Sequence, residues 1–161
     1  MRQSALFQLG TGLGTPSTSR KEDFAIATPA VVQTEARNDH FVVRNGVRCA
    51  GAHLIVDLYE AHGLDDIDLI ESTLRDCVDA AGATLLHIHL HHFEPNGGVS
   101  GVAVLAESHI SIHSWPEANY AAIDIFMCGN ANPDACIPVL REAFRAKRVA
   151  VSELLRGQGA A

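Results

Sequence analysis

Four short runs rich in apolar and β-branched residues follow one another in the second half of the chain. They cover residues 84–93, 99–107, 109–114 and 120–128. The first run ends in Glu-Pro-Asn-Gly-Gly at 94–98, a sequence typical of a tight turn. Runs of this length and composition, separated by turn residues, are typical of strands. The segment therefore predicts four consecutive strands, with a sheet at the centre of the fold.

Two helices are predicted on either side of this series. Apolar residues recur at helical spacing through 66–81, after an aspartate cap at 65 or 66 and before Gly82, a typical C-terminal stop. Asn132 is the expected cap of the second helix and Pro133 its first residue. Because Pro138 follows one turn later, we expect it to shorten or bend this helix.

Two further strands, at 51–60 and 149–154, complete the pattern. The resulting order is strand, helix, four strands, helix and strand, which indicates two similar halves. Each half would lay one helix on antiparallel strands. The predicted fold class is therefore α+β, a two-layer sandwich with an antiparallel sheet and helices on one face.

The chain divides near residue 47. Residues 1–46 scatter Gly, Ser, Thr, Pro and Gln without sustained periodicity, so they bury too little apolar area to offset the entropy of ordering. We expect a disordered N-terminal extension there, with at most a short edge strand near residues 41–43. The folded domain is predicted to span 47–157, followed by a short tail at 158–161.

Composition excludes several classes of protein. Nineteen acidic side chains against twelve basic ones give a net charge of −7, whereas nucleic-acid binding needs clustered positive charge. No apolar run approaches the ~18 residues that span a bilayer. The four cysteines lack CxxC spacing, which argues against a disulfide scaffold. We expect a cytoplasmic protein without nucleic-acid or membrane partners, and the acidic balance agrees with a cationic small-molecule substrate.

Histidines are concentrated in one predicted strand. His87, His89 and His91 recur at period two, so their side chains would project from one face of the strand. Three converging imidazoles can hold zinc, but successive side chains on one face stand about 7 Å apart. A polar strand face is the favoured interpretation, and a zinc site, substrate contacts or subunit contacts are the alternatives.

Reactive side chains are concentrated at residues 107–117, Glu-Ser-His-Ile-Ser-Ile-His-Ser-Trp-Pro-Glu. No G-x-S-x-G turn raises the serine above a sheet, so a hydrolase triad fits poorly. A serine in a tight β connection has another reaction open to it, attack on its own preceding carbonyl. The peptide would become an ester, β-elimination would break the chain, and hydrolysis would leave a pyruvoyl group. That ketone provides a Schiff-base electrophile and an electron sink.

The stretch AESHISIHSWPE at 106–117, with YAAIDIFMCG at 120–129, resembles the processing and active-site region of the prokaryotic S-adenosylmethionine decarboxylases. The similarity extends to HLIVDLY at 53–59, GVSG at 98–101 and AKRV at 146–149. It covers roughly residues 48–157, the whole predicted core, and leaves out the N-terminal extension.

The resemblance implies roles in cleavage and catalysis. Ser108 matches the serine that becomes the pyruvoyl group, so autocatalytic cleavage is expected between Glu107 and Ser108. His113 matches the histidine that moves protons during self-processing, and Ser100 matches a serine that assists the same step. Cys128 matches the cysteine that protonates the substrate carbon after carbon dioxide leaves. The implied cofactor is a covalently bound pyruvoyl group generated from Ser108, and no metal is implied.

The resemblance also implies how the substrate is bound. Phe93 and Trp115 match aromatic side chains that stack on adenine, and Glu117 matches the carboxylate that holds the ribose hydroxyls. The implied enzyme is a self-processing lyase, made as a zymogen. It converts S-adenosyl-L-methionine to the decarboxylated aminopropyl donor of spermidine and polyamine biosynthesis. The implied assembly is a homodimer of cleaved protomers with the site near the subunit interface.

Three other functions remain as alternatives. The turn at 94–98 is one residue longer than the form typical of the family, and relatives of this kind also decarboxylate arginine or ornithine. An uncleaved paralogue that regulates an active partner is the second alternative. A zinc hydrolase built on His87, His89 and His91 is the third. Phe93, Trp115 and Glu117 favour a nucleoside substrate. An aromatic face and a carboxylate that binds a diol would contribute little to the recognition of arginine.

Overall fold

The computed structural model describes residues 40–160. In chain order the elements are β1 (Val42–Arg44), β2 (Val47–Cys49), β3 (Gly51–Tyr59), α1 (Ile67–Ala81), β4 (Leu85–His92), β5 (Val99–Leu105), β6 (Ser108–Trp115), η1 (Pro116–Ala118), β7 (Tyr120–Met127), η2 (Pro133–Ala135), α2 (Cys136–Ala143) and β8 (Arg148–Arg156). All the strands and both α-helices expected from the sequence are present.

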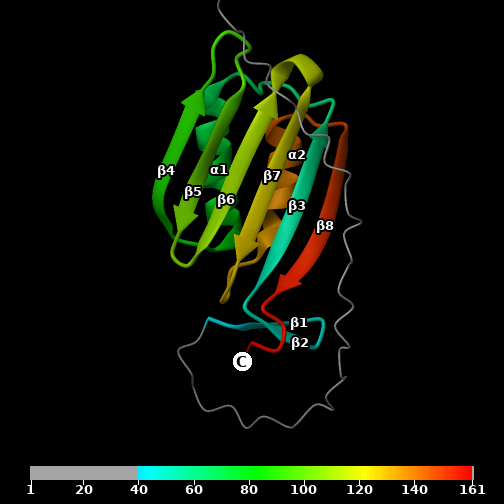
Figure 1. Ribbon diagram of the computed structural model, residues 1–161. Helices are drawn as coiled ribbons and strands as arrows, with labels where there is room; N and C mark the ends of the chain where they lie inside the picture. Colours follow the sequence, from blue (N-terminus) through cyan, green and yellow to red (C-terminus); the bar gives the residue numbers. More distant parts are fainter. Residues whose placement is uncertain (1–39, 161) are drawn as a thin grey trace, which may run out of the picture. The chain divides into compact units, whose positions relative to one another are not determined.

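One antiparallel sheet of six strands, in the order β4-β5-β6-β7-β3-β8, forms the body of the domain (Figure 1). β5 and β6 are joined by a turn of only two residues, since Leu105 pairs with Ser108. Both α-helices lie on the same face of this sheet (Figure 1). The predicted two-layer α+β sandwich is confirmed.

The helices begin and end where local signals predict. Asp66 caps α1 by accepting hydrogen bonds from the backbone N–H groups of Asp68 and Leu69, and Gly82 ends it in the left-handed conformation with φ of 68°. The second helical segment is divided into the 3-10 turn η2 and an α-helix of 8 residues. Pro138 lies in the first turn of α2, where a missing N–H costs little. None of the helices among residues 40–160 is long and apolar enough to cross a membrane.

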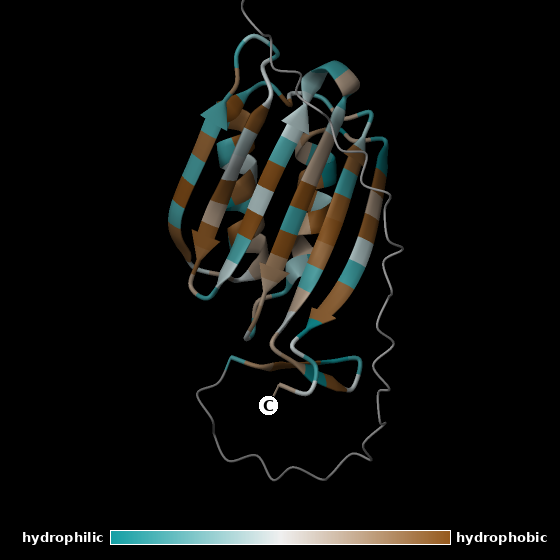
Figure 2. Ribbon diagram, viewed as in Figure 1, coloured by the Kyte–Doolittle hydropathy of each residue, from teal (hydrophilic) through white to brown (hydrophobic). Residues whose placement is uncertain are grey.

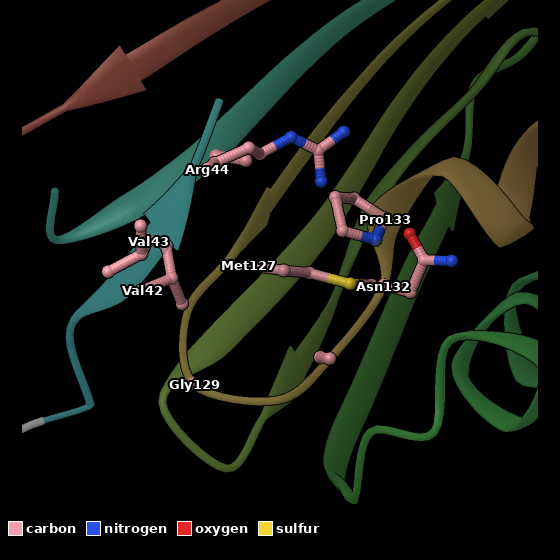
Figure 3. A pocket seen from close by; sticks show the side chains of 9 residues that line it. Val42, Val43, Arg44, Met127, Gly129, Asn132 and Pro133 are labelled. Atoms are coloured by element: carbon pink, nitrogen blue, oxygen red, sulfur yellow. The ribbon is translucent and has the colours of Figure 1, made fainter. Parts of the chain in front are cut away.

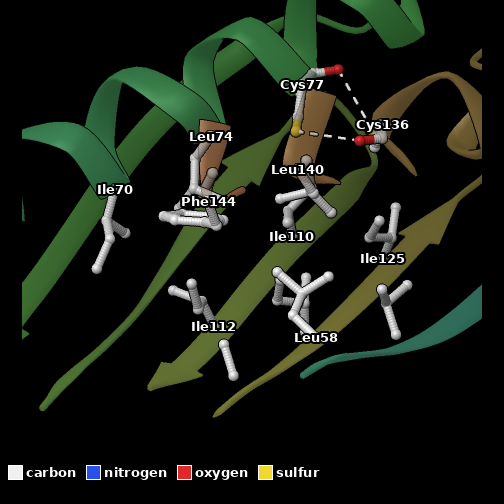
Figure 4. Close-up of a cluster of buried hydrophobic side chains, with 14 of the residues drawn as sticks. Leu58, Ile70, Leu74, Cys77, Ile110, Ile112, Ile125, Cys136, Leu140 and Phe144 are labelled. Carbon is white, nitrogen blue, oxygen red and sulfur yellow. Dashed lines mark hydrogen bonds between the residues drawn. The ribbon is translucent and has the colours of Figure 1, made fainter. Parts of the chain in front are cut away.

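The core lies between the sheet and the two helices. Figure 4 shows Ile110, Ile112 and Ile125 from the strands packed toward Leu74 and Phe144 from the helical layer, and all five are buried. Burying one such side chain contributes about 1.5–3 kcal/mol. Inward side chains alternate with outward ones along each strand, which gives the banded hydropathy of Figure 2. This alternation determines which side chains of β6 face the core.

The opposite face of the sheet is covered by no helix of the described chain. Its apolar side chains stay accessible, with Ile55, Val104 and Leu154 exposed by 38%, 39% and 48%. His113 and Trp115 of β6 lie on this open face, because their neighbours Ile112 and Ser114 point into the core. On this face the apolar side chains stand among polar ones, among them His113 and Asp124.

The predicted disordered extension at 1–46 is wrong for its last residues, and 1–39 lie outside the described part of the chain. β1 and β2 pair as an antiparallel hairpin, with Val42 opposite Cys49. The turn consists of Asn45 and Gly46, with φ of 52° and 76°. Asn-Gly is the dipeptide that favours a two-residue hairpin turn. The domain boundary expected at 47 therefore falls inside a hairpin.

Candidate active site

Ser108 begins β6 directly after the two-residue turn, and it is almost enclosed, with 8% of its surface exposed. Cys128, the residue after β7, lies beside it, because β7 is the neighbouring strand in the sheet. The backbone N–H of Cys128 donates to Ser108 Oγ at 3.2 Å, and the two side chains approach to 3.7 Å. The serine oxygen is thus held by main chain and cysteine together.

The peptide carbonyl before Ser108 is held as well. Cys128 Sγ donates a hydrogen bond to the carbonyl oxygen of Glu107 at 2.8 Å. Glu107 itself has φ of +69°, a left-handed conformation that costs a residue other than glycine about 1–2 kcal/mol. A strained peptide whose carbonyl is polarised by a thiol is suited to attack by the adjacent hydroxyl.

A second group of the expected residues lies at the other end of β6. Ser100 and His113 are paired across β5 and β6, and Ser100 Oγ lies 2.8 Å from His113 Nδ1. They border a cavity of about 210 Å³. Its lining residues are Phe93, Asn96, Gly98, Ser100, His113, Ser114, Trp115 and Glu117. The structure therefore gathers five of the predicted site residues around one hollow.

Aromatic rings give this cavity its flat surfaces. Trp115 is 41% exposed and Phe93 is 49% exposed. Tyr120, which the sequence did not single out, lies 5.3 Å from Trp115 with the ring planes 32° apart. Its hydroxyl donates to Asp57 at 2.6 Å, and this hydrogen bond raises the pKa of Tyr120 to about 12. Trp115 is thus supported on one side and open to a planar ligand.

The floor of the cavity depends on buried main-chain contacts. Ser114 Oγ accepts from the N–H of Val99 at 2.8 Å and donates to the carbonyl of Leu64 at 2.7 Å. Gly98 approaches so closely that an added Cβ would stand 2.9 Å from the carbonyl oxygen of Ser114. Ser114 was not predicted as a site residue, because a serine inside the motif gives no sign of a partner 50 residues away.

The two groups are separated within one protomer. Ser108 and His113 stand five residues apart on one strand, which corresponds to about 17 Å. They also face opposite sides of the sheet, since Ser108 is buried with the core and His113 is exposed on the open face. Ser100 and His113 therefore do not reach Ser108 of their own chain.

The histidines of β4 form no metal site. His87, His89 and His91 are all exposed on this edge strand. Among residues 40–160, no group of three or more His, Cys, Asp or Glu side chains is arranged to hold a metal ion. Nothing in this part of the chain favours the zinc-hydrolase alternative.

Comparisons with known proteins point in one direction. Residues 52–157 match the family model described as S-adenosylmethionine decarboxylase. The S-adenosylmethionine decarboxylase proenzyme of Thermomicrobium roseum is 47% identical over 112 residues, which are 69% of this chain and 97% of that protein. The proenzyme of Methanococcus aeolicus is 46% identical over 110 residues, 66% of this chain and 93% of that protein. The crystal structure of the adenosylmethionine decarboxylase from Aquifex aeolicus matches with a TM-score of 0.58 and 32% identity, covering 66% of this chain and 90% of that one.

Proposed function

Since the chain belongs to the S-adenosylmethionine decarboxylase family, we propose that it cleaves itself between Glu107 and Ser108 and then decarboxylates S-adenosylmethionine. The observation that carries this proposal is the contact of Cys128 with both sides of that peptide bond. Its thiol donates to the Glu107 carbonyl, and its N–H donates to Ser108 Oγ. The relatives' description as proenzymes agrees with a chain that processes itself.

In the proposed cleavage, Ser108 Oγ attacks the carbonyl carbon of Glu107. The carbonyl oxygen gains negative charge, which the Cys128 thiol stabilises as a hydrogen-bond donor. Release of the serine nitrogen leaves an ester, and loss of the Cα proton of residue 108 expels the Glu107 carboxylate. Addition of water and loss of ammonia then leave a ketone at the new N-terminus. No outside oxidant or reductant is needed.

The residues around position 108 fit the pyruvoyl group that this cleavage would generate. The position is nearly enclosed and lies within reach of the Cys128 thiol. A pyruvoyl group supplies a carbonyl that takes up the substrate amine and accepts the electron pair released with carbon dioxide. Because Cys128 Sγ lies 3.7 Å from Ser108 Oγ, we assign Cys128 the proton that replaces the carboxylate.

Substrate recognition is assigned to the cavity at the other end of β6. The exposed faces of Phe93 and Trp115 suit the adenine ring, and the Glu117 carboxylate suits the two ribose hydroxyls. Arginine and ornithine offer neither a planar base nor a diol. Carbon dioxide release from S-adenosylmethionine, arginine and ornithine, measured in parallel, tests this choice. Release from arginine or ornithine alone would contradict it.

A second copy of the chain would bring the two separated groups together. A twofold axis that packs two sheets with their strands antiparallel sets the Ser108 end of one protomer against the His113 end of the other. Ser100 and His113 would then assist cleavage in the partner. The exposed apolar side chains of the open sheet face, among them Ile55 and Val104, supply the surface to be buried. We therefore propose a homodimer with composite sites.

Intact-mass measurement of the purified chain tests cleavage itself. The expected result is two fragments, 1–107 and 108–161, with the second fragment blocked at its N-terminus. A single full-length chain under conditions that support activity would contradict the proposal.

Co-expression of two variants tests the composite site. Ser108→Ala lacks the nucleophile, and His113→Ala lacks the assisting histidine. Each variant alone is expected to stay largely uncleaved. In a mixed dimer, the His113→Ala chain keeps its own Ser108 and receives His113 from the partner, so this chain should be cleaved. Tags of different mass identify which chain was cut. Equal failure to cleave in the mixture would show that the site lies within one protomer.

The proposed setting is the cytoplasm, where decarboxylated S-adenosylmethionine would serve as aminopropyl donor for spermidine synthesis. The four cysteines, Cys49, Cys77, Cys128 and Cys136, are all free. Free thiols agree with a reducing compartment.

A further inference from the structure

The segment 40–49 lies before residue 52, where the match to the family model begins. It nonetheless reaches the proposed cleavage site. His40 Nε2 lies 3.1 Å from Glu107 Oε2, a contact that is an ion pair when the imidazole is protonated. The backbone carbonyl of His40 accepts from the N–H of Gly129 at 2.8 Å. One residue of this segment therefore contacts both the residue before the scissile bond and the residue after Cys128.

His40 is carried by a structured element. Directly after it comes the β1–β2 hairpin, whose Asn45-Gly46 turn has the left-handed backbone that a two-residue hairpin needs. Arg44 of β1 forms ion pairs with Asp134 and with Glu153. The hairpin is thus also bound to the body of the domain through residues other than Glu107.

The hairpin and the loop after β7 enclose a second cavity of about 210 Å³. Figure 3 shows Val42 and Arg44 from β1, Met127 and Pro133 facing them, and Gly129 on the loop below Val42. Gly129 has φ of +61°, a backbone conformation that favours glycine, and its N–H donates to the carbonyl of His40. The hairpin therefore packs against the same loop that positions Cys128.

We propose that His40 is a positioning residue for self-cleavage. Glu107 must keep a left-handed backbone for its carbonyl to meet the Cys128 thiol, and a charge partner for its side chain favours that arrangement. The inference rests on the proposed cleavage at Glu107–Ser108 and adds to it a device outside the family match. The pair is exposed on both sides, by 58% and 54%, so its effect on rate is a few-fold.

The test follows the half-life of the full-length chain after synthesis in a cell-free system, with intact mass as the readout. His40→Ala is expected to slow cleavage about threefold, the range of an exposed ion pair. His40→Lys keeps a cation beside Glu107 and should restore most of the rate. His62→Ala is the matched control, since His62 is an exposed histidine of the loop after β3 and contacts no residue of the cleavage turn. Its rate should equal that of the unmodified chain.

A second readout separates positioning from general damage. Once His40→Ala is fully cleaved, its kcat and KM for S-adenosylmethionine should match those of the unmodified enzyme. Arg44→Ala loosens the hairpin and should slow cleavage as well. Cleavage of His40→Ala at the unmodified rate would overturn the inference, as would a slow His40→Lys or an equal loss of kcat in the cleaved enzyme. An unmodified chain that never cleaves would contradict the proposed function instead.

Discussion

The two ends of β6 are built in different ways. At the Ser108 end, the contacts run through main-chain groups, the N–H of Cys128 and the carbonyl of Glu107, and the serine is 8% exposed. At the Trp115 end, side chains face an open cavity, and Trp115 is 41% exposed. Covalent chemistry is thus assigned to an enclosed, backbone-held position, and ligand recognition to an accessible one.

Because of this difference, cleavage and substrate binding should respond differently to substitutions at the two ends of β6. Contacts through the backbone depend on the register of β5, β6 and β7, so the enclosed end has few side chains that can be exchanged. Removing one of them should abolish a step or slow it by a large factor. Each side chain at the open end contributes one of several contacts to a ligand, so losses there should be partial. Substitutions at the Ser108 end should therefore cost more activity than substitutions at the Trp115 end.

Replacing Ser108 should have the largest effect. Ser108→Ala removes the proposed nucleophile at the scissile bond, so the chain should stay full length and show no decarboxylase activity. Intact mass and carbon dioxide release measure both outcomes. The fold should survive, because alanine fits a position that is already buried with the core. Cleavage of this variant would show that the bond is broken by another group.

Cys128→Ala should come next, because it removes a donor to the Glu107 carbonyl and the proposed acid of the decarboxylation. The loss of one such donor typically costs about 10²-fold in rate. Cleavage should therefore be slow but reach completion, and kcat of the cleaved enzyme should fall by at least the same factor. Cys128→Ser keeps a hydrogen-bond donor and should cleave faster than the alanine variant. Cleavage of both variants at the rate of the unmodified chain would exclude a role for the thiol in processing.

Most of the fold could be predicted because its signals are local. Alternation marks the strands, and Asp66 and Gly82 mark the ends of α1 within the sequence itself. The β1–β2 hairpin was missed although Asn45-Gly46 is a local signal too. Its strands have three residues each, too few for a period to emerge from the surrounding polar sequence.

The site could be predicted only in part, because its geometry depends on register. Sequence similarity named Ser108 and Cys128, but their contact across 20 residues follows from the pairing of β6 with β7. In the sequence His113 comes only five residues after Ser108, so the motif does not reveal that the two residues lie at opposite ends of one strand. The contact of His40 with Glu107 has no counterpart in any local pattern. Long-range contacts of this kind become visible only in the folded chain.

Trp115→Ala should cause a partial loss at the open end. Stacking of a base on an aromatic side chain contributes about 1–3 kcal/mol, so KM for S-adenosylmethionine should rise about tenfold or more. Self-cleavage should proceed at the unmodified rate if Trp115 only binds substrate. Trp115→Phe keeps an aromatic face and should recover part of the affinity. An unchanged KM in the alanine variant would show that the adenine binds elsewhere.

Tyr120→Phe should have the smallest effect. It should lower the free energy of unfolding by an amount that depends on pH. A phenol whose pKa is raised to about 12 stays neutral in the folded protein where the unfolded chain ionises. Its contribution is therefore complete below pH ~10, the ordinary tyrosine value, and declines as pH rises toward 12. Phenylalanine removes the hydrogen bond to Asp57, at a cost of about 1 kcal/mol at neutral pH. The ring beside Trp115 remains, so KM should hardly change.

Unfolding of the Tyr120→Phe variant and of the unmodified protein by urea at pH 8 and pH 11 measures the effect. The two proteins should differ less in stability at the higher pH. A constant difference would mean that the Tyr120 hydroxyl is not what stabilises this end of the sheet.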